Sequence, residues 1–320
     1  MELLTVRCMR KTLHALPLPL AAAAHSATLR FRARDARRAA VNAGVSDEDL
    51  GRAVDRILTV LEAGPLQHRV LEQRLMSQGI PVPVGRIAIK TAWENGQIVY
   101  GNATTAWNRE ARTFALPATT FPGFVLDLDR GRALTTLIEA YFDRYGPATI
   151  RDATWWSGLS AADILTALSS CGREVVRVGT PWSDADALMF ADRLEDFRTA
   201  DPVTTGVNLL AHEDTALKAY HQTRTRYLGD LPQRRAFNQI GEALPTVMVD
   251  GRIAGTWQWD PARRAVVVSL ARGRTTASQR RQVKNAADAL TSTLRQGWVA
   301  TRTSAIDADG RQLLLTGTSE

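Results

Sequence analysis

Apolar side chains recur every three or four residues along several segments, a spacing that predicts helices with one buried face. The first of these helices lies at residues 46–63, where Ser46 and Asp49 form a capping-box-like start. Two further helices are predicted at residues 67–77 and 84–94. The apolar stripe of the first helix consists of Leu50, Val54, Ile57, Leu58 and Leu61.

A two-stranded hairpin is predicted directly after these helices. Asn95-Gly96 is a tight-turn signal that leads into a strand at residues 97–101, and residues 112–116 can return beside it. Three short helices followed by a two-stranded ribbon are typical of a winged helix. In that fold the third helix can enter a major groove while the ribbon contacts the flanking backbone. The basic residues of this segment that are placed to face nucleic acid are Arg86, Lys90, Arg109 and Arg112.

The same order of elements then recurs. Helices are predicted at residues 131–145, 149–156 and 160–170, and a second ribbon at residues 174–178 and 188–190. In both segments a Gly-Pro pair separates the first helix from the second. Because two independent segments agree, this repeat is the strongest internal signal in the chain, and it predicts tandem winged helices.

The segment before the first repeat combines a strand, a helix and a basic stretch. Residues 3–8 predict the strand, and Pro17 and Pro19 mark the entrance of a helix at residues 20–28. Residues 29–43 fit either a solvated helix face or a strip that faces phosphates. The arginines of this stretch are Arg30, Arg32, Arg34, Arg37 and Arg38.

A third region begins at residues 201–202. It holds predicted strands at residues 207–211 and 313–315, a polar helix around residues 214–227 and another helix near residues 276–296.

Residues 244–270 predict two strands with their turns. Apolar, β-branched and aromatic positions supply the strands, while Asp250-Gly251 and Asp260-Pro261 are turn signals. A rigid hairpin with basic tips can probe a nucleic-acid groove, but a soluble sheet edge has the same pattern. The arginines at or beside these turns are Arg252, Arg263 and Arg264.

Together these elements predict an α+β fold that is mostly α with small β-hairpins. Its expected parts are tandem winged helices and a small mixed C-terminal domain. We place the remnant of a first winged-helix region at residues 1–45, winged helices at residues 46–120 and 121–200, and a mixed α/β domain at residues 201–320.

The charge balance supports a polyanionic partner. The 320 residues carry a net charge of +7, and nearly all of the positive side is arginine, whose guanidinium group pairs well with phosphate.

Cys8 and Cys171 are too few for a disulfide framework, so we expect two reduced thiols in a cytoplasmic protein. The five histidines lack metal-ligand spacing, so we expect neither a metal nor another cofactor.

Membrane insertion and secretion are not expected. No apolar run approaches the ~20 residues that span a bilayer. Residues 1–27 resemble a signal peptide, but His14, Pro17 and Pro19 interrupt its apolar part.

Three segments carry a resemblance to a known family. MRKTLHALP at residues 9–17, YGPATIRDATWWSGLS at residues 145–160 and PTVMVDGRIAGTW at residues 245–257 occur in that order and at suitable separations. Together they resemble the AlkZ/YcaQ-type family of tandem winged-helix proteins, and the likeness covers almost the whole chain.

The resemblance implies a DNA-repair function. Characterised members of the family are DNA glycosylases that remove N7-alkylated guanines and unhook interstrand crosslinks without a metal, their winged helices wrapping the duplex. We therefore expect double-stranded DNA, alkylated or crosslinked, as the partner of a monomeric protein. The expected DNA contacts are Arg7, Arg10, Lys11, Arg86, Lys90, Arg112, Arg151, Arg252, Arg263 and Arg264.

The sequence departs from the family at the catalytic motif. Catalytic members carry Gln-aliphatic-Gln or Gln-aliphatic-Asp upstream of the MRxTLH segment, which here begins at Met9. Gln258-Trp259-Asp260 has the spacing but lies in the C-terminal hairpin with an aromatic middle residue. The chain is therefore either a truncated product or a natural short homologue that binds DNA without cleavage. Truncation would expose an apolar surface on Leu3, Leu4 and Val6.

Several side chains have both a structural and a functional interpretation. His14 could orient a phosphate or a water as a catalytic residue, although a structural histidine is the more frequent case. Trp155 and Trp156 could stack an extruded base, but core packing is the simpler expectation. His212-Glu213-Asp214 fits a helix N-terminus as well as an acid/base cluster, and Glu195-Asp196 fits a solvated face.

The sequence thus predicts a DNA-binding, glycosylase-like protein whose catalytic motif is missing. One alternative is an active alkylpurine DNA glycosylase for repair or self-resistance that uses His14 or an omitted N-terminus. The other alternative is a transcriptional regulator or a protein-interaction module.

Overall fold

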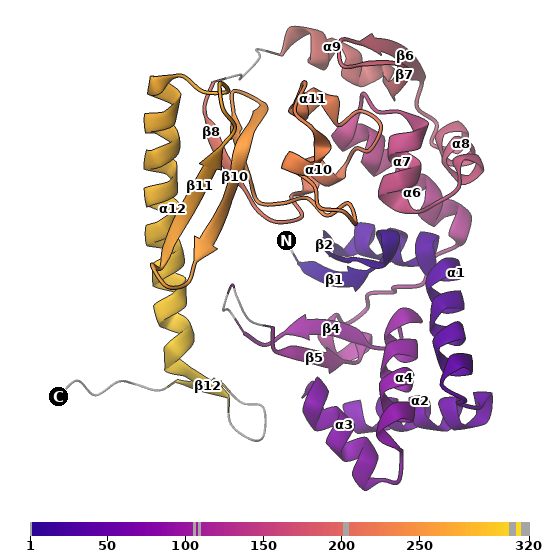
Figure 1. Ribbon diagram of the computed structural model, residues 1–320. Coiled ribbons are helices and arrows are strands. Elements are labelled where there is room, and N and C mark those ends of the chain that lie inside the picture. Colours follow the sequence, from indigo (N-terminus) through magenta and orange to yellow (C-terminus); the bar gives the residue numbers. More distant parts are fainter. Residues whose placement is uncertain (1, 105–106, 108–109, 201–204, 307–311, 315–320) are drawn as a thin grey trace, which may run out of the picture. The chain divides into compact units, whose positions relative to one another are not determined.

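The computed structural model describes residues 2–104, 107, 110–200, 205–306 and 312–314 (Figure 1). Arg109 of the predicted ribbon, residues 201–202 and residue 315 of the predicted last strand lie outside these described residues. The chain divides into two compact units, Met1–Leu137 with Ala300–Glu320 and Ile138–Val299. Each unit is described by itself.

The first unit contains a five-stranded sheet in the order β2-β1-β4-β5-β3. Its strands β1 (Leu3–Arg7) and β2 (Leu13–Pro17) form an antiparallel hairpin around the turn η1 (Met9–Lys11). The remaining strands of the sheet are β4 (Val99–Asn102), β5 (Arg112–Ala115) and β3 (Leu66–Gln67).

The apolar residues of β1 alternate between its two faces. Leu4 and Val6 are buried, whereas Leu3 is 51% exposed. The alternation follows from strand geometry, because Leu4 and Val6 share one face of the sheet and that face is covered. Of the three residues named for an apolar surface, Leu3 alone is exposed.

The helices predicted at residues 46–63, 67–77 and 84–94 are confirmed within two residues at their ends, whereas the helix predicted at residues 20–28 is longer. They are α2 (Asp47–Leu61), α3 (His68–Ser77) and α4 (Val82–Glu94), and the short α5 (Pro117–Thr120) follows the hairpin. Ser46 caps α2 by accepting a hydrogen bond from the Asp49 amide, as its sequence pattern predicts. Ile57, Leu71, Leu75, Ile89 and Phe114 belong to the core that α2, α3, α4 and β5 enclose.

Helix α1 (Leu18–Asn42) joins the predicted helix and the basic stretch into one element. Arg30, Arg34, Arg37 and Arg38 are exposed, as either interpretation of the stretch requires. Arg32 fits neither the solvated helix face nor the phosphate-facing strip, because its side chain is only 1% exposed. It lies one turn after Thr28 and two turns after His25 on the buried face of the helix, where both contact its side chain.

Those partners form a buried polar cluster of Arg32, Glu94, His25, Thr28 and Arg7. Arg32 Nη1 donates to Glu94 Oε2 at 2.8 Å and to the Glu94 carbonyl at 2.9 Å. Its Nε donates to Thr28 Oγ1 at 3.1 Å, and its Nη2 donates to the His25 carbonyl at 2.8 Å. Arg7 binds the other oxygen of Glu94. The cluster thereby joins β1, α1 and the end of α4.

The second unit opens with helices in the predicted order. They are α6 (Arg130–Tyr145), in which the boundary between the units lies, α7 (Ile150–Ser157) and α8 (Ala161–Ser170). The hairpin of β6 (Val175–Thr180) and β7 (Ser183–Phe190) follows, and α9 (Ala191–Thr199) comes next. Strand β7 begins earlier than the predicted residue 188, because alternating Ala185, Ala187 and Met189 also fit one strand face.

The tip of this second hairpin packs onto the chain rather than projecting alone. Thr225 Oγ1 donates to the Trp182 carbonyl at 2.6 Å. The guanidinium carbon of Arg226 lies 4.8 Å from the centre of the Trp182 ring. Trp182 therefore ties the turn between β6 and β7 to α11 (Thr225–Leu228).

The rest of the second unit is built on a four-stranded sheet in the order β11-β10-β9-β8. Residues 244–270 hold three strands and not the two predicted: β9 (Thr246–Val249), β10 (Arg252–Asp260) and β11 (Ala265–Leu270). Strand β8 (Val207–Leu210) adds the fourth. The prediction missed one strand because the Asp250-Gly251 turn itself separates two strands that pair with each other.

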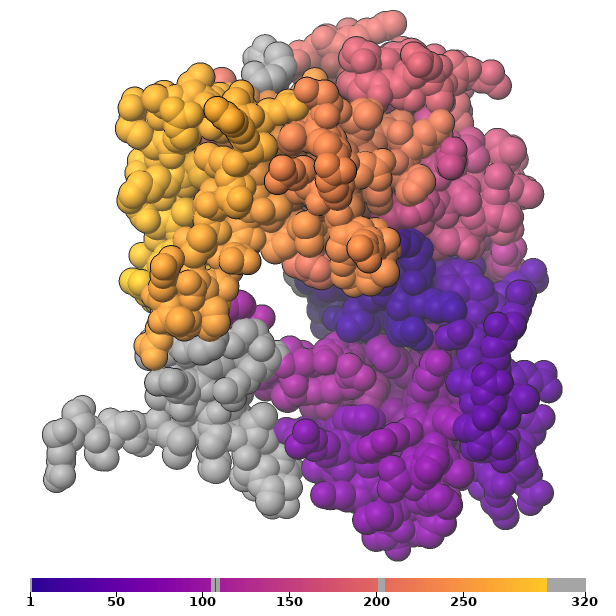
Figure 2. Space-filling model, in the orientation of Figure 1, coloured from indigo at the N-terminus to yellow at the C-terminus, as the bar shows by residue number. Residues whose placement is uncertain are grey.

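Helices cover both faces of this sheet. Val283 of α12 (Ala277–Thr303) packs against Val247 and Ala254 on one face. On the other face Met248 and Ile253 pack with Leu217 of α10 (Thr215–Lys218) and Leu228 of α11. The predicted polar helix at residues 214–227 is therefore two short helices. In Figure 2 the residues of α12 that are drawn in colour lie beside those of the sheet. Strands β12 (Ser304–Ile306) and β13 (Gln312–Leu314) pair with each other.

Candidate nucleic-acid interface

The turn between β1 and β2 presents the basic residues of the MRKTLH segment. Arg10 and Lys11 have φ angles of 52° and 63°, a left-handed conformation that non-glycine residues adopt only when the surroundings hold it. The amide of Lys11 donates to the Cys8 carbonyl at 2.8 Å, and the amide of Thr12 donates to the Met9 carbonyl at 3.1 Å. Because Cys8 and Met9 are buried, they anchor a turn whose basic part faces outward.

Asp35 of α1 brings the turn together with the third helix of the first repeat. Lys11 Nζ lies 2.8 Å from Asp35 Oδ1, and Lys90 Nζ of α4 lies 3.4 Å from Asp35 Oδ2. The hydrogen bond from Lys11, followed by the charge of Lys90, lowers the pKa of Asp35. Two lysines from distant segments thus pair with one carboxylate. We call Lys11, Lys90 and Asp35 the hairpin–helix cluster; Arg10 precedes Lys11 in the same turn.

His14 of β2 lies two residues beyond Thr12, at the end of the same turn. Its Nε2 is 2.8 Å from Thr12 Oγ1, and that hydroxyl also lies 2.9 Å from the Met9 carbonyl oxygen. The contact holds the imidazole ring beside the basic turn, with its donor and acceptor nitrogens set by the tautomer.

The other expected contacts of the first unit form ion pairs inside the chain. Arg7 binds Glu94 in the buried polar cluster and thereby has a structural role. Arg86 Nε lies 2.6 Å from Glu72 Oε1, and Arg112 Nη2 lies 3.0 Å from Glu110 Oε2. The Arg86 side chain remains largely exposed, so this pair leaves it accessible from solvent.

The expected contacts of the second unit do not form one patch. Arg252 opens β10, while Arg263 and Arg264 lie in the turn that follows its end at Asp260. A strand of 9 residues separates the two ends by roughly 27 Å. Arg263 pairs with Asp260 at 3.6 Å, and the backbone of Arg264 accepts from Arg295 at 2.6 Å. Arg151 is exposed on α7.

Asp152 has a larger role than the sequence predicts. It completes the capping box of α7 with Thr149 and is itself fully buried. Its Oδ1 also accepts hydrogen bonds from the amides of His221 at 2.7 Å and Gln222 at 2.6 Å. Thr223 Oγ1 donates to its Oδ2 at 2.8 Å. The capping-box spacing in the sequence signals the first role only, because residues 221–223 are distant along the chain.

The two tryptophans of the same motif have different surroundings. Trp156 packs against Tyr141 with ring centres 4.8 Å apart and against Tyr145 at 6.2 Å. The expectation of core packing is thus confirmed for Trp156. Trp155 instead lines a pocket with His221, Arg224 and Phe237.

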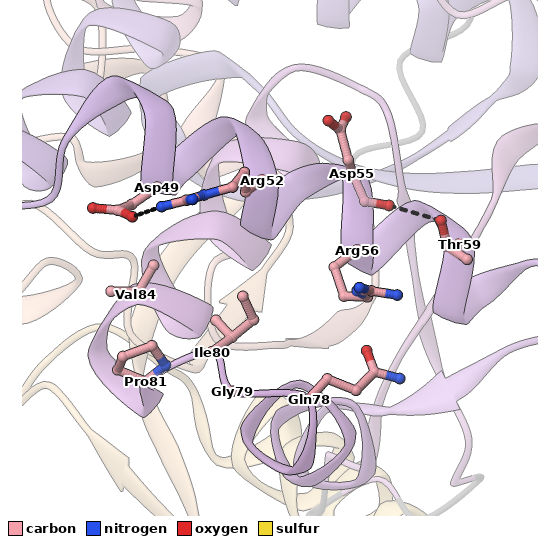
Figure 3. Close-up of a pocket in the computed structure, with 10 residues that line it drawn as sticks. All are labelled: Asp49, Arg52, Asp55, Arg56, Thr59, Gln78, Gly79, Ile80, Pro81 and Val84. Atoms are coloured by element: carbon pink, nitrogen blue, oxygen red, sulfur yellow. Dashed lines mark hydrogen bonds and ion pairs between the residues drawn. The ribbon is translucent and has the colours of Figure 1, made fainter.

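A second pocket lies in the first unit, between α2 and the turn from α3 to α4 (Figure 3). Its volume is about 640 Å³. Asp49, Arg52, Asp55 and Arg56 line one side, with Asp49 bound to Arg52, and Ile80, Pro81 and Val84 are among the residues of the other. Because carboxylates and guanidinium groups alternate along α2, the pocket has no preference for an anion.

The described part of the chain contains no group of three or more histidine, cysteine or acidic residues arranged to hold a metal ion. Cys8 and Cys171 are free thiols, as predicted. Burial raises the pKa of Cys8 to about 12.

Within the same described residues, no helix has the length and hydropathy needed to cross a membrane. Among the other candidates, Asp214 caps α10, while Glu195 and Asp196 are exposed on α9.

Comparisons with known proteins identify relatives along most of the chain. A family model described as DNA glycosylase AlkZ-like matches residues 1–293. The interstrand DNA cross-link repair glycosylase of Streptomyces sahachiroi is 28% identical over 152 residues, which cover 46% of this chain and 40% of that relative. The solved structure of Streptomyces sahachiroi DNA glycosylase AlkZ matches with a TM-score of 0.69 and 22% identity, covering 88% of this chain and 76% of that one. This structural likeness shows a shared fold.

Proposed function

Because the chain belongs to the AlkZ-like DNA glycosylase family, we propose that it binds duplex DNA in the repair of alkylated or crosslinked DNA. The observation that carries the proposal is the hairpin–helix cluster, in which Lys11 and Lys90 converge on Asp35. We also propose that residues 46–120 and 121–200 are winged helices and that residues 201–320 form the mixed C-terminal domain. In this arrangement α4 supplies Lys90 and the MRKTLH turn supplies Lys11 to the same DNA backbone.

The electrostatics of the cluster favour a phosphate. Two lysines pair with one carboxylate, so the cluster keeps a net positive charge. Its ion pairs are partly exposed, and pairs of that kind contribute about 0–1 kcal/mol each. A DNA phosphate can therefore replace Asp35 as the partner of either lysine, with release of counterions from the duplex.

We propose a DNA-binding role for these 320 residues and assign none of them a step in hydrolysis of the glycosidic bond. Gln258-Trp259-Asp260 is their nearest approach to Gln-aliphatic-Gln or Gln-aliphatic-Asp. An active glycosylase and a sequence-selective regulator are the outcomes that would replace this proposal.

The test combines DNA binding with base release. We would titrate the protein onto a plain duplex and a duplex with N7-methylguanine at two or more salt concentrations, and then heat each sample in alkali. We expect salt-dependent binding to both duplexes and no strand scission. Scission of the methylated duplex alone would show an enzyme. Strong preference for one undamaged sequence would show a regulator, and absence of binding would overturn the proposal.

Substitutions of the lysines and of the aspartate in the hairpin–helix cluster should change DNA affinity in opposite directions. Lys11→Ala and Lys90→Ala should each weaken binding and reduce the slope of log affinity against log salt by about 1, because each removes one phosphate contact. Asp35→Asn should strengthen binding, since it removes the carboxylate that competes with phosphate. Arg198→Ala on α9 is the matched control, because it removes one exposed cation outside the cluster. Equal losses of affinity for Lys11→Ala, Lys90→Ala and Arg198→Ala would leave only a net-charge effect.

A further inference from the structure

One arginine side chain connects the turn between β1 and β2 to the buried polar cluster. Arg7 Nε donates to the Lys11 carbonyl at 3.0 Å, and Arg7 Nη1 binds Glu94 Oε1 at the end of α4. All of these groups belong to the first unit. Because the Glu94 side chain is fully buried, the far end of Arg7 is held inside the protein while its Nε reaches the backbone of a surface turn.

A second arginine fixes the position of Glu94. Arg32 Nη1 donates to Glu94 Oε2 at 2.8 Å, so each oxygen of the carboxylate is bound to a different guanidinium group. The same Nη1 also donates to the Glu94 carbonyl at 2.9 Å. Rotation of the carboxylate would break at least one of these pairs, which is costly where water cannot replace the lost partner. Glu94 is therefore a fixed anchor for Arg7.

The turn needs such an anchor because its backbone is strained. Arg10 and Lys11 are consecutive non-glycine residues with φ angles of 52° and 63°. This left-handed conformation costs free energy and persists only where the surroundings hold it. Arg7 Nε holds the carbonyl group of the second of these residues, directly before the chain enters β2. The Arg7 side chain thus stabilises the conformation that presents Lys11.

The same anchor relates Lys11 to Lys90. Lys90 lies four residues before Glu94, about one turn earlier on α4. Asp35 binds the amino groups of both lysines and thereby holds the tips of their side chains. The bonds of Arg7 to Glu94 and to the Lys11 carbonyl hold the backbone of the turn against α4. A phosphate that replaces Asp35 removes the first of these links but not the second.

We propose that Arg7 is a positioning residue for DNA binding, which keeps Lys11 beside Lys90 when a phosphate takes the place of the carboxylate between them. Arg7 itself contacts no phosphate in this role, because its guanidinium group remains bound to the buried Glu94. The inference rests on the proposed binding of duplex DNA. It gives an indirect role to a residue that the sequence predicts as a direct DNA contact.

Two substitutions of Arg7 distinguish positioning from direct contact with DNA. Arg7→Lys keeps the charge but has one nitrogen in place of the guanidinium fork, so it cannot bind Glu94 and the Lys11 carbonyl as arginine does. Arg7→Met keeps an unbranched stem and removes both bonds, while Arg32 still binds Glu94. Positioning predicts that both variants weaken duplex binding and reduce the slope of log affinity against log salt by about 1, because the contact of Lys11 is lost. Direct phosphate contact predicts this change in slope for Arg7→Met only.

A double-mutant cycle tests whether Arg7 acts through Lys11. In the Lys11→Ala protein, Arg7→Lys should leave the affinity within about twofold, the usual error of additivity, because the side chain that it positions is absent. In the Lys90→Ala protein the same substitution should cause its full loss of affinity. Arg198→Lys on α9 is the control in each background, since it makes the same exchange at an exposed arginine outside the cluster.

Two further measurements separate positioning from loss of folding. Urea denaturation should show that both Arg7 variants are folded under the conditions of the binding assay. Hydrogen exchange should accelerate at the amides of Lys11 and Thr12 but not at those of α2. Unchanged affinity and slope in Arg7→Lys, or an equal loss in the Lys11→Ala background, would overturn the inference and leave the proposed function intact. Absence of duplex binding by the unaltered protein would overturn both.

Discussion

At the scale of single residues, the most unusual feature is a buried network of charges. Arg32 and Glu94 are almost fully buried and bind each other, while His25 and Arg7 complete the cluster. Burial of charge is costly unless each group has partners, and here the guanidinium of Arg32 donates to Glu94, Thr28 and the His25 carbonyl. Loss of one partner should therefore be much more damaging than loss of a surface ion pair.

Glu94→Gln tests this consequence. The substitution removes the charge that compensates Arg32, so we expect the free energy of unfolding to fall by about 3–5 kcal/mol. Asp35→Asn is the control, because it breaks two partly exposed ion pairs and should cost at most about 2 kcal/mol. Urea denaturation of the two variants measures both values. Similar losses of unfolding free energy in the two variants would show that burial does not set the cost of breaking the network.

His25 makes stability depend on pH. Burial, followed by the charge of Arg32, lowers its pKa from 6.5 to about 3. Below pH 6.5 the unfolded chain takes up a proton that folded His25 rejects, so stability is present above that pH and is lost toward pH 3 by up to about 1.4 kcal/mol per pH unit. We expect His25→Gln to show a flatter dependence of the unfolding free energy between pH 6 and pH 4 (roughly the window that the shift defines). His212→Gln, at an exposed position, should keep the slope of the unaltered protein.

At the scale of elements, the Asp152 side chain joins α7 to residues 221–223, which are distant along the chain. Asp152 closes the first turn of α7 and also binds the amides of residues 221–223. The equivalent position of α8 is Asp163, whose Oδ2 accepts from the Ser160 hydroxyl at 2.9 Å. Both carboxylates stand three residues after a helix cap, but only Asp152 is buried between two segments.

Asp152→Asn and Asp163→Asn therefore form a matched pair. We expect Asp152→Asn to lower the free energy of unfolding by at least about 3 kcal/mol, since several hydrogen bonds to a buried carboxylate are lost. Asp163→Asn should cost about 1 kcal/mol or less, the value of a helix-terminal interaction. Hydrogen exchange should also accelerate at residues 221–223 in the first variant only. Equal costs would mean that Asp152 acts merely as a cap.

At the scale of the whole molecule, net charge and local charge have different consequences. The net charge of +7 attracts polyanions at long range. Arg7, Arg86, Lys90 and Arg112 nevertheless all have acidic partners inside the chain. The number of phosphate contacts therefore depends on which of these cations can exchange its acidic partner for a DNA phosphate. The lysines paired with Asp35 can do so because their ion pairs are partly exposed, whereas the arginines paired with the buried Glu94 cannot.

Local features of the fold could be predicted from the sequence by itself. The helices α2, α3, α4, α7 and α8 begin and end close to their predicted positions, because caps, Gly-Pro breaks and a 3.6-residue period act within a few neighbouring residues. The turn at Asp250-Gly251 was also foreseen for that reason, although the number of strands around it was not. The family resemblance depends likewise on contiguous residues.

Only the tertiary structure decided which polar side chains act together. Arg32 and Arg38 belong to the same basic stretch, yet one is buried with Glu94 and the other is exposed. Trp155 and Trp156 are neighbours, yet one lines a pocket and the other packs in the core. Lys11 and Lys90 meet at Asp35 because three distant segments fold onto one another. Such contacts depend on the path of the whole chain, which short-range patterns do not encode.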